Sequence, residues 1–191
     1  LPCKKALLRT PGPSEVPETI RYADISLVGD PCVLPLLSQE AFRQNRHHQV
    51  MLMVDMGDLR EGIWFENLDE IENALNQIIM LPNLSVYGFG TNFGFYGTIL
   101  ATEENTTQFV AIAKEMERRL GIDFPYISGG NGSTYYLAVQ GKLPKEINHL
   151  RIGGQHIFGI EYVEGKYLDG YFHSDKDVAL FASDAYLFKA E

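Results

Sequence analysis

Residues 126–159 read YISGGNGSTYYLAVQGKLPKEINHLRIGGQHIFG and contain two glycine-rich turns about twenty residues apart. Each turn comes directly after a short apolar run. Small residues let several backbone N–H groups converge on an anion where side chains would block its approach. The two turns therefore predict a phosphate-binding site at the ends of two neighbouring strands.

The segments around this stretch alternate between short apolar runs and longer helical patterns. The apolar runs are KALLR, ADISLV, QVMLMVDM, LSVYGFG, FPYIS and HLRIGG. Helices are expected over PSEVPETIRYA with Ser14 as its N-cap, PCVLPLLSQEAFRQNRHH, NLDEIENALNQIIMLP and TEENTTQFVAIAKEMERRLG. Leu120 followed by Gly121 is a helix stop signal. Alternation at this spacing predicts right-handed βαβ crossovers and a parallel sheet.

Polar or glycine-rich residues follow nearly every predicted strand at its C-terminal end, where ligands lie in a (β/α)8 TIM-type barrel. About six βα units precede residue 160, and a closed barrel needs eight. The expected fold is therefore α/β, with residues 1–160 forming a partial barrel. An open doubly wound sheet is the alternative, but its usual GxGxxG fingerprint is absent.

After Gly159 the pattern changes to alternating apolar and polar residues around Gly-Lys, Asp-Gly and Ser-Asp turns. Such alternation is typical of antiparallel strands. Residues 161–191 are therefore expected to begin a β-rich C-terminal domain. Because the chain does not start with Met, we also expect it to begin partway through a longer sequence.

Composition narrows the class of protein. The 191 residues are 45% hydrophobic and 21% charged, which fits one globular domain or a large part of one. A net charge of −9 argues against a nucleic-acid partner bound through its phosphates. No apolar run is long enough for a membrane span. Two cysteines without metal spacing favour a reducing cytoplasm.

Residues 51–63 read MLMVDMGDLREGI, in which an apolar strand ends at Asp55 and a loop with Arg60 follows. An arginine placed just beyond a strand end between glycines can reach into the barrel mouth and donate a fork of hydrogen bonds. The alternative is a solvated loop arginine paired with Asp58 or Glu61.

The next two strand ends carry small polar residues. They are Thr91, Asn92, Asn131, Ser133 and Thr134. Gly132 leading into the Ser-Thr pair is also what a helix N-cap turn needs, so this motif alone does not separate ligand binding from turn chemistry.

Arg151 lies inside the otherwise apolar run HLRIGG. An arginine cannot realistically lose its proton, so a buried one must find an acceptor. Arg151 is therefore expected to meet an acceptor at the end of this strand.

The motifs VDMGDLREG, GTNFGFYG, ISGGNGST and LRIGGQHIFG resemble, in order and spacing, those of the alanine racemase superfamily of pyridoxal-phosphate enzymes. The likeness is greatest to its ornithine racemase-like branch. It implies a pyridoxal 5'-phosphate cofactor, a small amino-acid substrate with a cationic side chain, racemisation by α-proton exchange, and a homodimer.

The resemblance also implies roles for individual residues. Gly153 and Gly154 offer backbone N–H groups to the cofactor phosphate, together with the turn of Asn131, Gly132, Ser133 and Thr134. Arg151 faces the pyridine nitrogen. Arg60 is directed at the phenolic oxygen of the cofactor or at the substrate carboxylate. Asn92 or Thr91 falls where many relatives place a histidine beside the ring.

Two catalytic groups of the family do not match any residue here. Its Schiff-base lysine lies on the first barrel strand, whereas the first segment matched here resembles the third. Its second base is a tyrosine from a partner's β-domain. Neither base is therefore expected within these 191 residues, and the chain alone is expected to be inactive. The alternative function is a non-catalytic pyridoxal-phosphate binding protein of the cofactor-homeostasis type, against which the β-rich end of the chain argues.

Overall fold

The computed structural model describes residues 3–94, 99–153, 162–163 and 166–167. Its main sheet is entirely parallel, with the strand order β1-β2-β3-β5-β6-β7. These strands are β1 (Ala6–Leu7), β2 (Ile25–Val28), β3 (His48–Asp55), β5 (Leu84–Gly90), β6 (Tyr126–Asn131) and β7 (His149–Arg151). A further strand, β4 (Ile63–Trp64), pairs in parallel with the end of β3. The predicted α/β half-barrel is thus confirmed.

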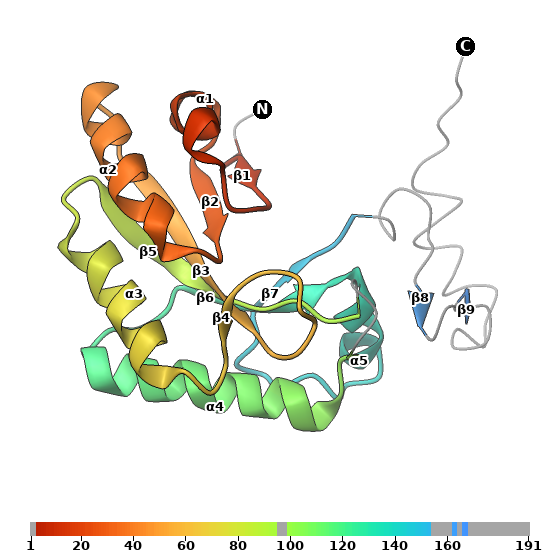
Figure 1. Cartoon of the computed structure of the whole chain (residues 1–191). Coiled ribbons are helices and arrows are strands. Elements are labelled where there is room, and N and C mark those ends of the chain that lie inside the picture. Colours follow the sequence, from red (N-terminus) through yellow and green to blue (C-terminus); the bar gives the residue numbers. More distant parts are fainter. Residues whose placement is uncertain (1–2, 95–98, 154–161, 164–165, 168–191) are drawn as a thin grey trace, which may run out of the picture.

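The helices follow one another around the outside of this sheet (Figure 1). They are α1 (Val16–Tyr22), α2 (Leu34–Arg43), α3 (Leu68–Met80), α4 (Glu103–Leu120) and α5 (Tyr135–Val139). Short 3-10 turns, η1 (Pro13–Glu15), η2 (Pro31–Val33) and η3 (Gly132–Thr134), precede α1, α2 and α5. Gly121 ends α4 with a left-handed φ of 65°, as predicted. Within the described ranges, no helix combines the length and apolarity needed to cross a membrane.

Two details of the helix prediction were wrong. Ser14 does not cap the first helix, because it lies inside η1, where the Glu15 carboxylate accepts from the Gly12 amide at 2.8 Å and closes the turn. The second helix ends at Arg43 rather than reaching His48, because Asn45 adopts a left-handed φ of 51° that breaks the helix.

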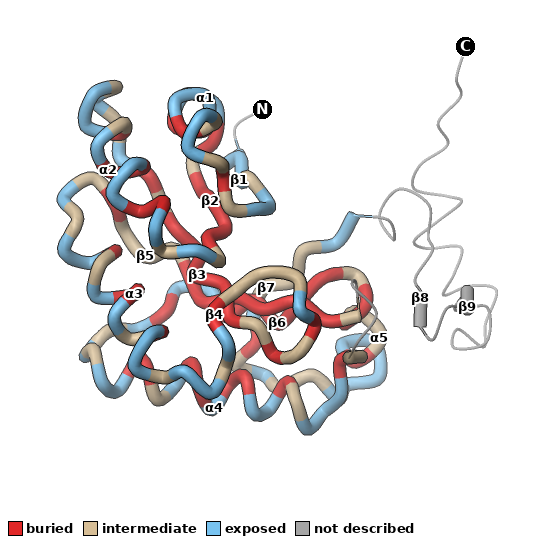
Figure 2. The backbone as a smooth tube through the Cα atoms, in the orientation of Figure 1, coloured by how far each residue is buried: buried red, intermediate tan, exposed pale blue. Residues whose placement is uncertain are grey.

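Most of the core lies between the sheet and its helices. Alternate strand residues such as Val50, Leu52 and Val54 point into this outer-face cluster and are fully buried. Phe89 stacks against Phe109 of α4 and against Phe124, at centroid distances of 5.4 and 5.1 Å. The buried stretches of the central strands stand out in Figure 2. This apolar packing explains why helix and strand alternate along the chain.

The opposite, concave face carries a smaller cluster of Leu27, Met51 and Met53, with Tyr87 packed against it. An irregularity in β5 makes this possible, because Val50 pairs with Val86 whereas Met51 pairs with Gly88. The extra residue lets Tyr87 face inward while Phe89 faces the helices.

Near the end of the described residues, β8 (Tyr162–Val163) and β9 (Lys166–Tyr167) form an antiparallel pair. Most of residues 161–191 lie outside the described part of the chain. The division into a barrel of residues 1–160 and a β-rich domain of residues 161–191 therefore stays a prediction.

Candidate functional site

A hollow of 350 Å³ lies on the concave face of the sheet. Its lining comes from both ends of the sheet order, with Lys4, Ala6 and Leu8 around β1 and residues 149–153 at and after β7. The sheet therefore curls so that its first and last strands face the same space. Because all strands are parallel, their C-terminal ends meet at one rim of this space.

Arg151 ends β7, and its guanidinium is held by three acceptors from two neighbouring strand ends. Nη2 donates to the Thr91 carbonyl at 2.5 Å and to Asn92 Oδ1 at 2.7 Å, and Nη1 donates to the Ser128 hydroxyl. These bonds use three of the five N–H groups of an arginine. The acceptors predicted for a cation in an apolar strand are thus present, and within the described residues two donors of the guanidinium are left for a ligand.

Burial lowers the pKa of Arg151 to about 10. The Glu61 carboxylate opposes this shift, and the positive charge of Arg60 adds to it. The guanidinium still carries its proton at neutral pH, so the rim of the hollow contains a fixed positive charge.

Asn92 connects Arg151 to the loop after β3. It is buried, accepts from Arg151 through Oδ1, and donates from Nδ2 to Glu61 Oε1 at 3.2 Å. Glu61 in turn lies 3.8 Å from Arg60 Nε. A pairing of Arg60 with Glu61 is therefore observed, and the charges of this loop lie close enough to influence the pKa of Arg151.

The loop that carries these charges is folded tightly onto the strands. Gly62 has φ +129°, and a Cβ there would lie 2.6 Å from the Asp55 backbone nitrogen. A Cβ on Gly29, at the end of β2, would lie 2.7 Å from the Gly62 backbone nitrogen. Glycine is therefore required where the loop returns to the ends of β2 and β3.

The turn after β6 is compact. Gly130 has φ +129°, and a Cβ on it would lie 2.2 Å from Thr134 Oγ1. Asn131 Oδ1 accepts from the Ser133 backbone nitrogen at 3.1 Å, so Asn131 is the N-cap of η3. The Ser133 hydroxyl lies within hydrogen-bonding reach of Asn131 Oδ1 and the Phe93 carbonyl. Contacts within and next to the turn thus satisfy both the backbone N–H and the hydroxyl of Ser133, without a ligand.

Turn chemistry does not account for every polar atom here. Asn131 Nδ2 and Thr134 Oγ1 are buried and have no hydrogen-bond partner within the described residues. A buried polar atom without a partner costs roughly 1–3 kcal/mol, so such atoms call for an explanation. A free amide donor beside a hydroxyl fits an anionic oxygen such as that of a phosphate.

The second glycine turn is described only in part. Gly153 is exposed, lines the hollow, and has open space where a Cβ would point. Gly154 lies outside the described residues. The structure therefore brings together Thr91, Asn92 and Arg151, places Arg60 next to them through Glu61, and sets Gly153 at the rim.

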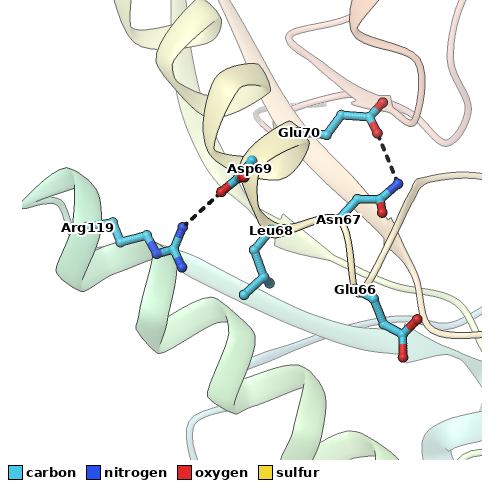
Figure 3. Close-up of a pocket in the computed structure, with 6 residues that line it drawn as sticks. All are labelled: Glu66, Asn67, Leu68, Asp69, Glu70 and Arg119. Atoms are coloured by element: carbon cyan, nitrogen blue, oxygen red, sulfur yellow. Dashed lines mark hydrogen bonds and ion pairs between the residues drawn. The ribbon is translucent and has the colours of Figure 1, made fainter.

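A second hollow, of 440 Å³, lies among the helices at the start of α3 (Figure 3). Its lining residues are Glu66, Asn67, Leu68, Asp69, Glu70 and Arg119. Arg119 lies 3.6 Å from Asp69, and Asn67 donates to Glu70 at 3.2 Å. No strand contributes to this hollow, and these contacts pair its polar side chains with one another. Within the described residues, no three histidine, cysteine, aspartate or glutamate side chains are arranged so that they could hold a metal ion, in this hollow or elsewhere.

The family model for the alanine racemase N-terminal domain matches residues 3–160. This chain belongs to that family. Ornithine racemase of Acetoanaerobium sticklandii is 39% identical over 170 residues, which are 89% of this chain and 48% of that protein. Lysine racemase of Thermotoga maritima is 34% identical over 163 residues, which are 85% of this chain and 44% of that protein. The chain thus spans about half the length of the curated relatives it matches.

Solved structures extend the likeness to the fold of the alanine racemase family. The chain superposes on PipY of Synechococcus elongatus without PLP with a TM-score of 0.65 at 19% identity, covering 81% of this chain and 71% of that one. The superposition on an alanine racemase of Clostridium difficile 630 has a TM-score of 0.58 at 18% identity. It covers 80% of this chain and 39% of that one. At these identities the likeness shows the fold alone.

Sequence reasoning missed three residues of the rim. They are Ser128, His149 and Glu61. Ser128 lies two positions before Gly130 of the predicted turn, and His149 lies two positions before Arg151. Glu61 directly follows Arg60. The period of two along a strand could have placed Ser128 with Gly130 and His149 with Arg151. No local signal distinguishes Glu61 from the other carboxylates of its loop.

Proposed function

We propose that this chain forms the cofactor-binding part of a pyridoxal-phosphate-dependent amino-acid racemase. The observation that carries the proposal is Arg151, a protonated guanidinium fixed at the end of an apolar strand with two N–H groups to spare. The racemase names of the two curated relatives support it.

The phosphate of the cofactor is held by the turn after β6 and by the start of the turn after β7. Asn131 Nδ2 and Thr134 Oγ1 supply the buried polar atoms without a partner, and Gly153 supplies backbone with open space above it. Gly132, Ser133 and Gly154 complete the set that we propose for this phosphate. The bound cofactor supplies the electron sink that makes the α-proton of an amino acid acidic.

With the cofactor bound, Arg151 would donate a hydrogen bond to the pyridine nitrogen and would keep that nitrogen unprotonated, because the pKa of Arg151, although lowered by burial, stays near 10. An unprotonated ring withdraws electrons less strongly, which favours simple proton exchange over other reactions of the substrate. Asn92 holds Arg151 in place rather than packing beside the ring, since both ends of its amide are already bonded. Arg60 meets the phenolic oxygen or the substrate carboxylate.

Racemisation needs a proton-transferring group on each face of the α-carbon. None of the lysines in the described part of the chain lies at the C-terminal end of a strand of the main sheet. Lys4 and Lys5 precede β1, Lys114 lies on α4, Lys142 and Lys145 lie between α5 and β7, and Lys166 begins β9. We propose that the cofactor-bearing lysine and the second base belong to the rest of the complete protein.

The substrate proposed is an amino acid with a cationic side chain, because the two curated relatives are named for ornithine and lysine. A homodimer and a cytoplasmic location stay predictions. The cofactor-homeostasis alternative gains no separate support, because the resemblance to PipY, at 19% identity, concerns the fold alone.

The experiment compares Arg151→Glu with Arg118→Glu, an exposed site on α4, in the complete protein. Arg151→Glu is expected to lower racemisation of ornithine and lysine at least about 100-fold, because a fixed charge at the ring is lost. Its cofactor absorbance should also shift, whereas Arg118→Glu changes neither. Chiral chromatography and absorbance spectra make the measurement. Unchanged racemisation and spectrum in Arg151→Glu would show that Arg151 is purely structural.

A further inference from the structure

His149 shares one hydroxyl with Arg151. The two residues lie two positions apart on β7, so their side chains lie on the same face of the strand, and both line the hollow. His149 Nδ1 is 2.8 Å from Ser128 Oγ, the oxygen that also accepts from Arg151 Nη1. Ser128 therefore lies between the imidazole and the guanidinium.

The direction of these hydrogen bonds follows from the groups themselves. A guanidinium only donates, so Ser128 Oγ must act as acceptor toward Arg151. The single hydroxyl hydrogen is then available to His149 Nδ1, which accepts it only when the imidazole is neutral and its proton is on Nε2. With the imidazole proton on Nε2, the order of donation is Arg151 to Ser128 to His149.

The surroundings of His149 favour this neutral form. Burial lowers its pKa, and the nearby charge of Arg151 lowers it further. The imidazole ring lies 5.6 Å from the ring of Tyr126 on β6 and 6.4 Å, edge to face, from that of Tyr87 on β5. Lys4, before β1, lies over the same Tyr87 ring. These facing groups include no carboxylate that would stabilise an imidazolium.

We propose that His149 is a positioning residue for Arg151 and acts through the Ser128 hydroxyl. By taking the hydroxyl hydrogen, His149 turns the oxygen lone pairs toward Arg151 and holds the Nη1 edge of the guanidinium. Thr91 and Asn92 hold the Nη2 edge, so the guanidinium is fixed from two sides. The inference rests on the proposed function only in its last step, that the fixed guanidinium faces the cofactor ring.

The first test needs no cofactor. In a ¹⁵N-labelled full chain, long-range ¹H–¹⁵N spectra near pH 7.5 should show His149 as the Nε2–H tautomer. His149→Phe identifies its signals among the five histidines of the chain and removes the acceptor while keeping a ring. In this variant and in Ser128→Ala, the side-chain Nε–H signal of Arg151 should shift and exchange faster with water.

Conservative variants guard against a folding defect. His149→Asn keeps an acceptor near the position of Nδ1, and Ser128→Thr keeps the hydroxyl, so both should restore the Arg151 signal. His47→Gln is the matched control, because exposed His47 meets Ser85 at 2.9 Å far from Arg151 and should leave the signal unchanged. An Nδ1–H tautomer of His149, or an Arg151 signal indifferent to His149→Phe and Ser128→Ala, would overturn the proposal.

The second test uses the complete protein with pyridoxal phosphate. His149→Phe should lower kcat about tenfold, the size of effect expected for the loss of one hydrogen bond that positions Arg151, with KM changed less than about threefold. His149→Asn should recover most of kcat. Suppose that the NMR signal of Arg151 responds as expected, but neither His149→Phe nor Arg151→Glu alters the cofactor spectrum. His149 then positions Arg151, and the proposed function fails. If only Arg151→Glu alters the spectrum, the positioning role of His149 is refuted.

Discussion

The two faces of the curved sheet use their residues in opposite ways. The outer face presents an almost continuous apolar surface to α1–α4. The buried apolar side chains described on the concave face are few, namely Ile25, Leu27, Met51 and Met53 beside Tyr87, and the rim beyond them carries the hydrogen-bonded residues around Arg151. Stability therefore comes mainly from the outer face, because burial of apolar area is the dominant favourable term in folding. The inner face is free to carry groups that are costly to bury.

The largest effect should come from an exchange on the outer face. Phe89→Ala removes a fully buried ring that stacks on two others, and should lower the free energy of unfolding by about 3–5 kcal/mol. Tyr87→Ala, two residues away but facing inward and partly exposed, should cost only about 1–2 kcal/mol. Urea unfolding of both variants measures the two free energies of unfolding. An equal loss of unfolding free energy in both variants would contradict the distinction between the two faces.

A smaller effect concerns His48, a buried imidazole at the start of β3 that meets Ser26 of β2 at 2.8 Å. Burial lowers its pKa from 6.5 to about 4. Below pH 6.5 the unfolded chain takes up a proton that the folded chain refuses, so stability falls as the pH drops toward 4. The loss should approach about 3 kcal/mol.

This pH dependence is measured as the difference between wild type and His48→Gln in urea unfolding from pH 7 to pH 4. His47→Gln, at the exposed neighbouring histidine, should keep the wild-type dependence. If the curve of His48→Gln ran parallel to that of wild type, the imidazole of His48 would have to take up its proton at the same pH in the folded and the unfolded chain.

The smallest effect on stability is expected at Gly153 on the rim. Among the described residues no atom lies within 4 Å of a Cβ built at Gly153, so Gly153→Ala should change the unfolding free energy by less than about 0.5 kcal/mol. Gly62→Ala is the contrast, because its Cβ would meet backbone at 2.6 Å. In the complete protein, Gly153→Ala should nevertheless weaken cofactor binding, measured by fluorescence titration. A destabilised Gly153→Ala would mean that the rim contributes to folding.

Much of the fold could be predicted because its signals are local. The strand LSVYGFG was placed at the residues of β5, and the Leu120–Gly121 pair ended α4 as expected. The prediction of Ser14 as the N-cap of the first helix failed, because the neighbouring Glu15 side chain accepts the hydrogen bond that closes this turn. Tyr87 and Phe89 lie two residues apart but face opposite sides of the sheet, because of an irregular pairing with β3 that no local pattern contains.

The candidate site divides in the same way. The sequence by itself determined that Arg151 needs an acceptor and that two glycine turns follow neighbouring strands, because charge, chain flexibility and strand period are properties of a residue and its neighbours. Only the tertiary structure decided which acceptors serve Arg151. Thr91, Asn92 and Ser128 reach it from strands 23 to 60 residues away in the chain, and such contacts arise only when parallel strands curl together and bring their C-terminal ends to one rim.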